Sequence, residues 1–439
     1  MNLLELLRNK TFWGIDFLKG KQVKSYYNTL KLIESGNPSS SELAEYQNKR
    51  LLELLTHAKK TVPFYKNITS NQLKDFPVVN KNDIRSNYDD FLSNDYSKSE
   101  LITMSTSGST GTPFLCYQDA RKKKHVNAET IYYNGKIGYR MGRRIIYFRS
   151  IVSEVSKTKL QQFMQNIYLM DCNDLSDNAI YNNLKRIAYM TKRSGAMIMG
   201  YASTMDAFAK FINNNSCEWV SKCNIYGIVS GSEMLKDQTR QILEKAFNCK
   251  CVSRYANEEN GFLGQDFDIN NEFYHNRADY YFEILKMDSD EPVKDNEIGR
   301  IVVTDYFNYA MPMIRYDTGD VGCWKQTMTD GVQRDIIASF GGRKVDQIYD
   351  SYGNYLSPHS ITNLMWAYNQ VIQYQFIQED HGKYRIILNV NKEWSEEKRL
   401  EADLKKVLKN DAVIVFEYVD EIPVLNSGKR RYIVNQMNL

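Results

Sequence analysis

The sequence predicts an α/β protein with a large N-terminal domain, built on mixed, largely parallel sheets flanked by helices, and a small C-terminal α+β lid domain. The 439 residues exceed the length at which a single core usually stops growing. Short apolar runs alternate with helix-like segments in the middle of the chain, and a second strand-and-helix pattern follows Gly341 and Gly342. We therefore divide the chain into a helical part (1–98), the core of the large domain (99–341) and the lid domain (342–439).

The first 98 residues show helical periodicity. One apolar face is formed by Leu51, Leu52, Leu54, Leu55 and Ala58. Between Met1 and Val23, leucines and aromatic residues are interspersed with lysines, and we interpret this segment as a packed amphipathic helix. Docking of that helix on a membrane surface stays open as an alternative. No run of about 18 apolar residues occurs, so we expect no transmembrane segment and a cytoplasmic protein.

The middle of the chain predicts β-α units. Short apolar runs are expected to form a largely parallel sheet from Ile145–Phe148, Ala196–Met199, Ile225–Val229 and Cys251–Tyr255. Amphipathic segments such as Asp237–Phe247 lie between them and are expected to be helices. Further on, Tyr281–Leu285 and Ile301–Thr304 are separated by turn residues, which favours antiparallel strands.

The last part of the chain predicts a β-β-α-β unit. Its strands are expected at Val371–Ile377, Arg385–Val390 and Val413–Val419. A helix should precede the third strand, with Ser395 as its candidate N-cap and an apolar face formed by Leu400, Leu404, Val407 and Leu408. Because glycine reaches backbone angles closed to other residues, we expect Gly341 and Gly342 to form a flexible joint before this unit.

Composition argues against several classes of function. The formal net charge of +4 is too small to predict a nucleic-acid partner. The seven cysteines have no zinc-finger or redox spacing, and we interpret them as thiols of a reducing cytosol. The five histidines form no H-E-x-x-H motif, so neither a zinc site nor a histidine-based hydrolase is predicted. The basic run from Arg121 to Lys124 is interpreted as a solvated helix face.

The segment Ser105–Pro113 is the most informative part of the sequence. It places hydroxyl side chains around Gly108 and Gly111. Glycine lets backbone N–H groups approach anionic oxygens, and hydroxyls add further donors, so the pattern suits a polyphosphate. It is not a Walker loop, because Thr112 and Pro113 stand where lysine and Ser or Thr are required. On pattern alone, an ordinary turn stays open.

With its surroundings, this segment resembles the signature of the adenylate-forming acyl-CoA synthetase superfamily and, within it, the phenylacetate-CoA ligase family. Val62–Tyr65 and Phe76–Ile84 resemble the segments that precede the loop in that family. The sequence Asn-Glu-Glu-Asn-Gly at 257–261 resembles the branch associated with capsule and surface-polysaccharide synthesis. The resemblance runs in order from about Val62 to Arg431.

The resemblance implies an ATP-binding site. The β- and γ-phosphates would be held by Ser107, Gly108, Ser109, Thr110, Gly111 and Thr112. Tyr255 matches the tyrosine that stacks on adenine, and the adenine-site turn is matched by Gly231, Ser232 and Glu233. Asp320 matches the aspartate that accepts hydrogen bonds from both ribose hydroxyls. Arg343 matches the arginine that meets ribose or phosphate.

The resemblance also implies two catalytic residues. Glu259 matches the glutamate that serves Mg²⁺, a hard cation that prefers carboxylate oxygens. Lys429 matches the lysine carried by the lid domain. Three positions depart from the family pattern: Ala256 replaces a glycine, Glu258 stands where a phosphate-binding hydroxyl is usual, and Val345 occupies a charged hinge position.

We therefore expect an adenylate-forming ligase that uses ATP and Mg²⁺ to convert a small carboxylic acid into acyl-AMP and pyrophosphate. The acyl group would then pass to a thiol, with coenzyme A as the candidate acceptor, in capsule or O-antigen biosynthesis. An amide-forming ligase with an amino sugar or amino acid acceptor stays open, as does a homodimer. A catalytically silent scaffold in a glycan-assembly complex is supported by the three departures and opposed by the presence of Asp320, Arg343 and Lys429.

Overall fold

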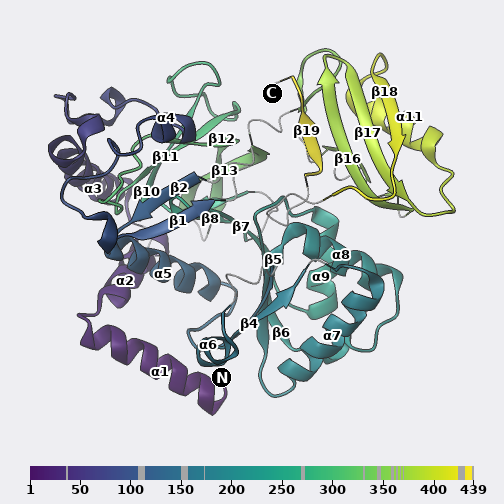
Figure 1. The fold of residues 1–439 in the computed structure, drawn as a ribbon, viewed down its shortest axis with the longest axis horizontal. Helices are drawn as coiled ribbons and strands as arrows, with labels where there is room; N and C mark the ends of the chain where they lie inside the picture. The colour runs from purple at the N-terminus through teal and green to yellow at the C-terminus, as the bar shows by residue number, and fades with distance from the viewer. Residues whose placement is uncertain are drawn as a thin grey trace.

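Helices make up most of the N-terminal part of the chain, on the left of Figure 1, and the C-terminal part forms a strand-rich unit at the upper right. The computed structural model describes residues 1–35, 38–106, 114–149, 157–172, 174–267, 272–329, 332–343, 348–356, 360–361, 364–365, 367–368, 370–423 and 431–437. The helices are α1 (Leu3–Leu18), α2 (Gln22–Ser35), α3 (Ser40–Thr61), α4 (Lys81–Ser86), α5 (Ala120–Gly135), α6 (Lys159–Gln165), α7 (Asp177–Thr191), α8 (Ala202–Asn214), α9 (Asp237–Phe247) and α11 (Glu397–Leu408). Single 3₁₀ turns lie at Pro63–Tyr65, Leu73–Asp75, Lys98–Glu100 and Val220–Lys222.

The central sheet has seven strands in the order β4-β3-β5-β6-β7-β8-β9. Their bounds are β3 (Arg144–Arg149), β4 (Ile167–Asp171), β5 (Ala196–Tyr201), β6 (Ile225–Gly231), β7 (Cys251–Asn257), β8 (Gly261–Gln265) and β9 (Tyr274–His275). The strands from β4 to β7 are parallel, and β8 and β9 are added antiparallel. The four strands predicted here are confirmed, as is helix α9 with its predicted bounds.

Helices α7, α8 and α9 cover one face of the parallel strands (Figure 1). Leu184, Phe208 and Leu243 are buried against Ile146 and Ile228 of the sheet. Burying large aliphatic and aromatic side chains contributes roughly 1.5–3 kcal/mol each. This layer therefore fixes the carboxyl ends of the parallel strands, where α/β proteins bind ligands.

A second, antiparallel sheet has the order β10-β11-β12-β13, and a separate hairpin is formed by β1 and β2. The bounds are β1 (Ile102–Thr106), β2 (Phe114–Gln118), β10 (Tyr280–Leu285), β11 (Gly299–Asp305), β12 (Tyr316–Thr329) and β13 (Val332–Arg343). The predicted antiparallel pair is confirmed as β10 and β11. Gly341 and Gly342, expected in a flexible joint, instead lie in β13, where Gly342 pairs with Val321.

The C-terminal unit contains a four-stranded sheet in the order β18-β17-β16-β19, with α11 packed against it. Its bounds are β14 (Ile348–Tyr349), β15 (Tyr355–Leu356), β16 (Val371–Asp380), β17 (Lys383–Val390), β18 (Val413–Tyr418) and β19 (Ile433–Asn435). The predicted β-β-α-β order is confirmed. The predicted Ser395 cap is wrong, because α11 begins one residue later and its N-cap position, Glu396, makes no side-chain capping bond.

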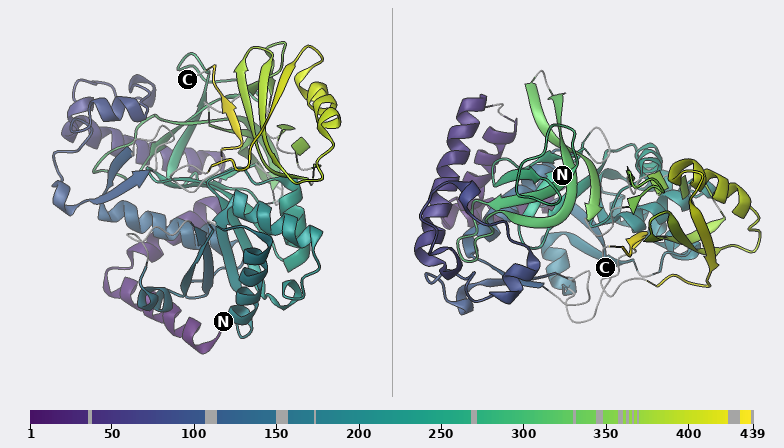
Figure 2. Two further views of the ribbon diagram at one scale, coloured as in Figure 1. Left: turned by 45° about the vertical axis from the view of Figure 1, so that its right-hand side comes forward. Right: turned by 90° about the horizontal axis from the view of Figure 1, so that it is seen from above.

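This C-terminal unit lies beside α8 and α9 of the large part (Figures 1 and 2). The ammonium of Lys236, which precedes α9, lies 5.6 Å from the ring centre of Tyr374 in β16 and 5.0 Å from that of Tyr432. On its other side Lys236 Nζ pairs with the buried carboxylate of Asp206 at 2.9 Å. A cation held by one part of the molecule therefore faces two aromatic rings of the other.

The N-terminal helix α1 corrects one expectation. A helix forms within the predicted segment Met1–Val23, but it ends at Leu18, and Val23 belongs to α2. Its leucines are not packed: Leu3 is 82% and Leu18 83% exposed, whereas Glu5 is buried. Gly142 brings the chain close to this helix, because a Cβ there would lie 2.5 Å from the carbonyl oxygen of Glu5. No described helix combines the length and apolarity needed to cross a bilayer.

Candidate active site

Two of the predicted adenine-site elements lie at the carboxyl ends of neighbouring parallel strands. Gly231 ends β6 and pairs with Arg254 of β7, the residue before Tyr255. Ser232 has a positive φ of 67°, so the chain turns sharply after the strand. Glu233 accepts a hydrogen bond at 2.8 Å from the backbone N–H of Ser203, at the start of α8. The carboxylate of Glu233 thus also satisfies a helix N-terminus.

Tyr255 and Asp320 lie next to each other. The Tyr255 hydroxyl donates to Thr318 Oγ1 at 3.2 Å, and Asp320 lies within hydrogen-bonding reach of the same hydroxyl. Burial, and after it the charge of Asp320, raises the pKa of Tyr255 well above its usual value. Asp320 is paired across β12 and β13 with Arg343, whose side chain lies outside the described part of the structure. The fold therefore brings these three predicted residues to one place.

Glu259 is only 1% exposed and is held by two side chains from distant parts of the sequence. Its Oε1 lies 2.6 Å from Lys81 Nζ, and the Tyr316 hydroxyl donates to the same oxygen at 3.1 Å. Lys81 is brought there because Val79 pairs with Tyr316 in a parallel bridge. The sequence placed Lys81 in a family-like segment without giving it a role. The local sequence shows only a lysine at the start of a short helix, which does not indicate a contact with Glu259.

Lys81 also lies beside the end of the Ser/Thr/Gly segment. Its ammonium is 5.7 Å from the ring centre of Phe114, and the Arg85 guanidinium is 5.8 Å from it. Phe114 pairs with Thr106, so this hairpin brings together the two ends of the 107–113 segment. Two cations consequently flank the base of the predicted phosphate loop.

Several predicted residues lie outside the described part of the chain. These are the loop residues Ser107, Gly108, Ser109, Thr110, Gly111 and Thr112, the hinge residue Val345, and Lys429. Of the departures from the family pattern, Ala256 and Glu258 are exposed. The side chain of Glu258 is thus directed differently from that of its neighbour Glu259.

The turn that carries Glu259 is fixed through its backbone. Gln118 Nε2 donates to the carbonyl oxygens of Glu258 and Glu259, both at 3.2 Å. The Tyr280 hydroxyl donates to Asn260 O at 2.7 Å, and the N–H of Phe262 donates to Glu129 at 3.1 Å. These partners are buried, so the turn has little freedom to move.

A buried ionic network lies beneath this turn. Lys122 Nζ lies 2.9 Å from Asp305, 2.8 Å from the Tyr280 hydroxyl and 3.9 Å from Glu129. Burial disfavours the charged lysine, but Asp305 and Glu129 outweigh it and raise the pKa of Lys122. Burial raises the pKa of Glu129 well above its usual range. The prediction of a solvated face for Arg121–Lys124 is therefore wrong at Lys122, which is fully buried.

The donor set at Glu259 fits a magnesium ion shared with a nucleotide. Mg²⁺ is usually bound by one or two carboxylates together with substrate phosphates and water. Glu259 offers one such carboxylate, beside the base of the predicted phosphate loop. Within the described residues no cluster of three or more His, Cys, Asp or Glu side chains could hold a metal by itself.

Comparisons with known proteins agree with this architecture. Residues 348–436 match the family described as the CapK C-terminal domain. The chain is 28% identical to Protein CapK of Staphylococcus aureus over 450 residues, covering 97% of this chain and 95% of that protein. It superposes on 2-hydroxyisobutyryl-CoA ligase in its postadenylation state with a TM-score of 0.70 and 13% identity, over 91% of this chain and 90% of that one. The fold is that of the adenylate-forming CoA ligases, including their C-terminal domain.

The same ligase in other states superposes less well. Its open conformation gives a TM-score of 0.55, and its thioesterification state gives 0.53, over 88% and 91% of this chain respectively. Of these three structures, the postadenylation state superposes best on this chain.

Proposed function

We propose that this protein activates a carboxylic acid with ATP, forming an acyl-AMP, and then transfers the acyl group to the thiol of coenzyme A. The observation that supports this best is the meeting of Tyr255 and Asp320 at the carboxyl edge of the parallel sheet, opposite Arg343. A tyrosine face beside a carboxylate that can accept from two hydroxyls suits a nucleoside.

In the first step, a carboxylate oxygen of the substrate attacks the α-phosphorus of ATP. The bond from that phosphorus to the bridging oxygen of the β-phosphate breaks, and pyrophosphate leaves. The protein's contribution is to position the reactants and to offset charge. Asp320 would hold the ribose, Tyr255 and the turn Gly231–Glu233 the adenine, and Ser107–Thr112 the β- and γ-phosphates.

Magnesium, when bound, would offset the charge of the triphosphate. Glu259 would hold it, and Lys81, which pairs with Glu259 in this structure, would then be available to the phosphates. The side chains of Gln118 and Tyr280 donate to backbone carbonyls of the turn and would keep Glu259 in place with and without the ion. Lys429 of the lid domain would stabilise the negative charge that develops in this step.

In the second step, the thiolate sulfur of coenzyme A attacks the acyl carbon. The bond from that carbon to the phosphate oxygen breaks, releasing AMP, and the thiol proton goes to solvent. Coenzyme A is favoured as the acceptor because the structural neighbours are CoA ligases. A role in capsule or O-antigen biosynthesis is suggested by the motif at 257–261 and by similarity to Protein CapK along nearly the whole chain.

The decisive experiment measures pyrophosphate release from ATP and Mg²⁺ with a panel of carboxylic acids, followed by thioester formation on adding coenzyme A. Lys429→Ala should reduce acid-dependent pyrophosphate release about a hundredfold to a thousandfold while ATP affinity changes only a few fold. Synthetic acyl-AMP and coenzyme A should still react in that variant. Adenylation by Lys429→Ala at the wild-type rate would contradict the mechanism. If the wild type transfers the acyl group only to amines, the acceptor is an amine and not coenzyme A.

A further inference from the structure

Helix α1 presents its apolar side to solvent. At 100° per residue, its exposed Leu3, Leu4, Leu6, Leu7, Ile15, Phe17 and Leu18 cover an arc of about 180°. Glu5 and Asp16 lie on the opposite side and are buried, at 1% and 7% exposure. An amphipathic helix of a soluble domain has the reverse arrangement, with apolar residues inward and acids outward. The apolar arc of α1 is therefore not used to pack the domain.

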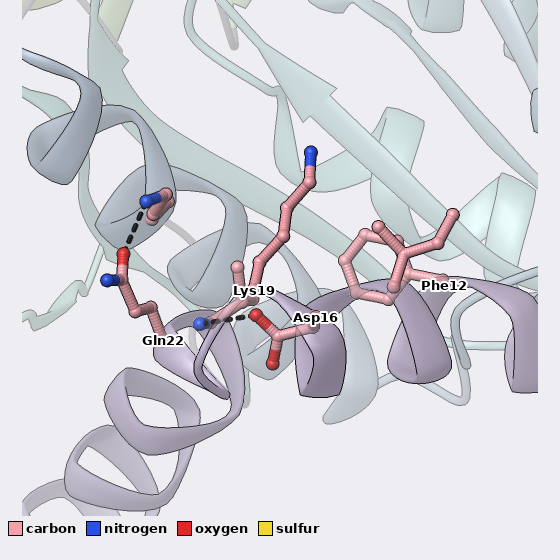
Figure 3. A pocket seen from close by; sticks show the side chains of 7 residues that line it. Phe12, Asp16, Lys19 and Gln22 are labelled. Atoms are coloured by element: carbon pink, nitrogen blue, oxygen red, sulfur yellow. Dashed lines mark hydrogen bonds between the residues drawn. The ribbon is translucent and has the colours of Figure 1, made fainter.

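This orientation is fixed by specific polar contacts. Glu5 accepts from the N–H of Asn2, and Asp16 accepts from the N–H groups of Val23 and Lys24, so the two inward acids cap α1 and α2. In Figure 3, Asp16 points toward the start of α2, next to the pocket lined by Phe12. On the same helix the Arg8 guanidinium donates to the carbonyl oxygen of Phe163 at 2.7 Å. The arc cannot turn inward without losing these bonds.

The apolar surface continues from α1 onto α6. The guanidinium of Arg8 also lies 5.1 Å from the ring centre of Phe163, which joins the two helices. On α6, exposed apolar side chains are supplied by Leu160, Phe163 and Met164. The described residues include 21 exposed large apolar side chains, and α1 and α6 supply seven and three of them. A patch of this kind marks an interaction surface.

The charges on this patch have one sign. Among α1, the turn to α2 and α6, the only acidic residues are Glu5 and Asp16, both buried. Exposed cations are Lys10, Lys19, Lys21 and Lys159. Lys10 lies within the apolar arc, where its long stem can lie along apolar surface while its ammonium reaches outward. An apolar helix face with only cations beside it is complementary to a surface of anionic head groups over acyl chains.

From this we infer that α1 and α6 dock the protein on the surface of an anionic lipid bilayer, with the leucines of α1 inserted at the head-group level. The helix lies at the periphery of the molecule, so a bilayer can approach it without obstruction by the other elements (Figures 1 and 2). The inference does not depend on the ligase reaction, because α1 lies apart from the strands β7 and β12 that carry Tyr255 and Asp320 (Figure 1). Docking would bring a soluble catalytic site to a membrane-associated acyl donor or acceptor.

The test is vesicle co-sedimentation of the full chain, using phosphatidylcholine vesicles with and without phosphatidylglycerol. The wild type should bind only the anionic vesicles, and high salt should weaken that binding. Leu3→Ser/Leu7→Ser/Leu18→Ser should lower the affinity at least about tenfold, since three inserted side chains lose their burial. These residues are exposed, so the variant should retain the wild-type melting temperature.

The matched control replaces three exposed apolar residues elsewhere: Met328→Ser/Ile372→Ser/Val413→Ser. It should bind vesicles as the wild type does. Lys10→Gln/Lys19→Gln/Lys21→Gln should abolish the preference for anionic vesicles. The inference is overturned if the wild type binds no vesicles, or if both triple serine variants bind equally. A third outcome also overturns it: sedimentation velocity shows that the wild type is a dimer and the α1 variant a monomer, and neither binds vesicles. The patch would then be an interface between two copies.

Discussion

Asp320 is the residue that we propose to hold the ribose of the nucleotide. Replacing it with asparagine keeps the shape of the side chain but removes the charged double acceptor for the ribose hydroxyls. A hydrogen bond to a charged group contributes about 1.5–3 kcal/mol, so Asp320→Asn should weaken ATP binding about tenfold or more. Titration calorimetry with ATP and Mg²⁺ measures this. The control Asp335→Asn, at an exposed position of β13, should bind ATP as the wild type does. If the wild type and both variants bind ATP with equal affinity, Asp320 is not part of the site.

Lys81 is expected to exchange partners when nucleotide binds. Its ammonium pairs with the carboxylate of Glu259, so Lys81→Gln leaves that buried carboxylate without its cation. Mg²⁺ alone should then bind more tightly, because no lysine competes for the carboxylate, whereas the KM for ATP should rise about tenfold. Isothermal titration with the metal and steady-state kinetics separate these two effects. Lys98→Gln, which breaks an exposed ion pair with Asp89, serves as control. If both constants change in the same direction, the exchange does not occur.

At the scale of elements, the buried network joins α5 to β10, β11 and the turn that carries Glu259. Lys122→Met leaves Asp305 and Glu129 buried beside each other without a cation. Removing one partner of a buried pair typically costs about 3–5 kcal/mol, and we expect a loss of that size in urea unfolding. Lys98→Met should cost much less, because its ion pair with Asp89 is exposed to solvent. A loss at Lys122 no larger than at Lys98 would show that the network contributes little.

The sequence allowed most elements of the fold to be predicted, because their signals are local. The runs at Ile225–Val229 and Asp237–Phe247 are continuous in sequence and have the periods of a strand and a helix. Lys122 could not be recognised as buried, since its partner Asp305 lies on a strand far along the chain. The interpretation of α1 as a packed helix was wrong, because periodicity shows that a helix is amphipathic but not which side faces the protein.

Only part of the candidate site could be predicted, because some of its contacts join segments that are distant in the sequence. Tyr255, Glu259 and Asp320 were predicted as site residues from the resemblance of short motifs, and the structure brings Tyr255 and Asp320 together. Lys81 was missed as a partner of Glu259 because the contact depends on the bridge between Val79 and Tyr316. Such long-range pairing is not encoded in any short segment.

At the scale of the whole molecule, Lys236 links the two parts of the chain. Its contacts with Tyr374 and Tyr432 hold the C-terminal unit beside the large part of the molecule in the arrangement seen here. A desolvated cation–π pair contributes about 2 kcal/mol, so Tyr432→Leu should depopulate this arrangement and slow adenylation several fold. Thioester formation from synthetic acyl-AMP should not slow. Small-angle scattering and single-turnover kinetics of the two half-reactions provide the measurements.

Tyr432→Phe keeps the ring and is the matched control for that variant. It should retain the wild-type arrangement and the wild-type adenylation rate. If Tyr432→Leu slows both half-reactions equally, or if Tyr432→Phe behaves as the leucine variant does, the ring of Tyr432 does not stabilise one arrangement over the other.

The buried network also limits how sequences of this kind can diverge. A relative that has lost Lys122 alone has two buried carboxyl groups without their cation. A relative that has lost Asp305 alone has a buried ammonium without its nearest carboxylate. Replacing both with apolar residues of similar volume removes either penalty. Substitutions at positions 122 and 305 should therefore occur together among divergent relatives, so that the pair behaves as one inherited character although its members lie on different elements.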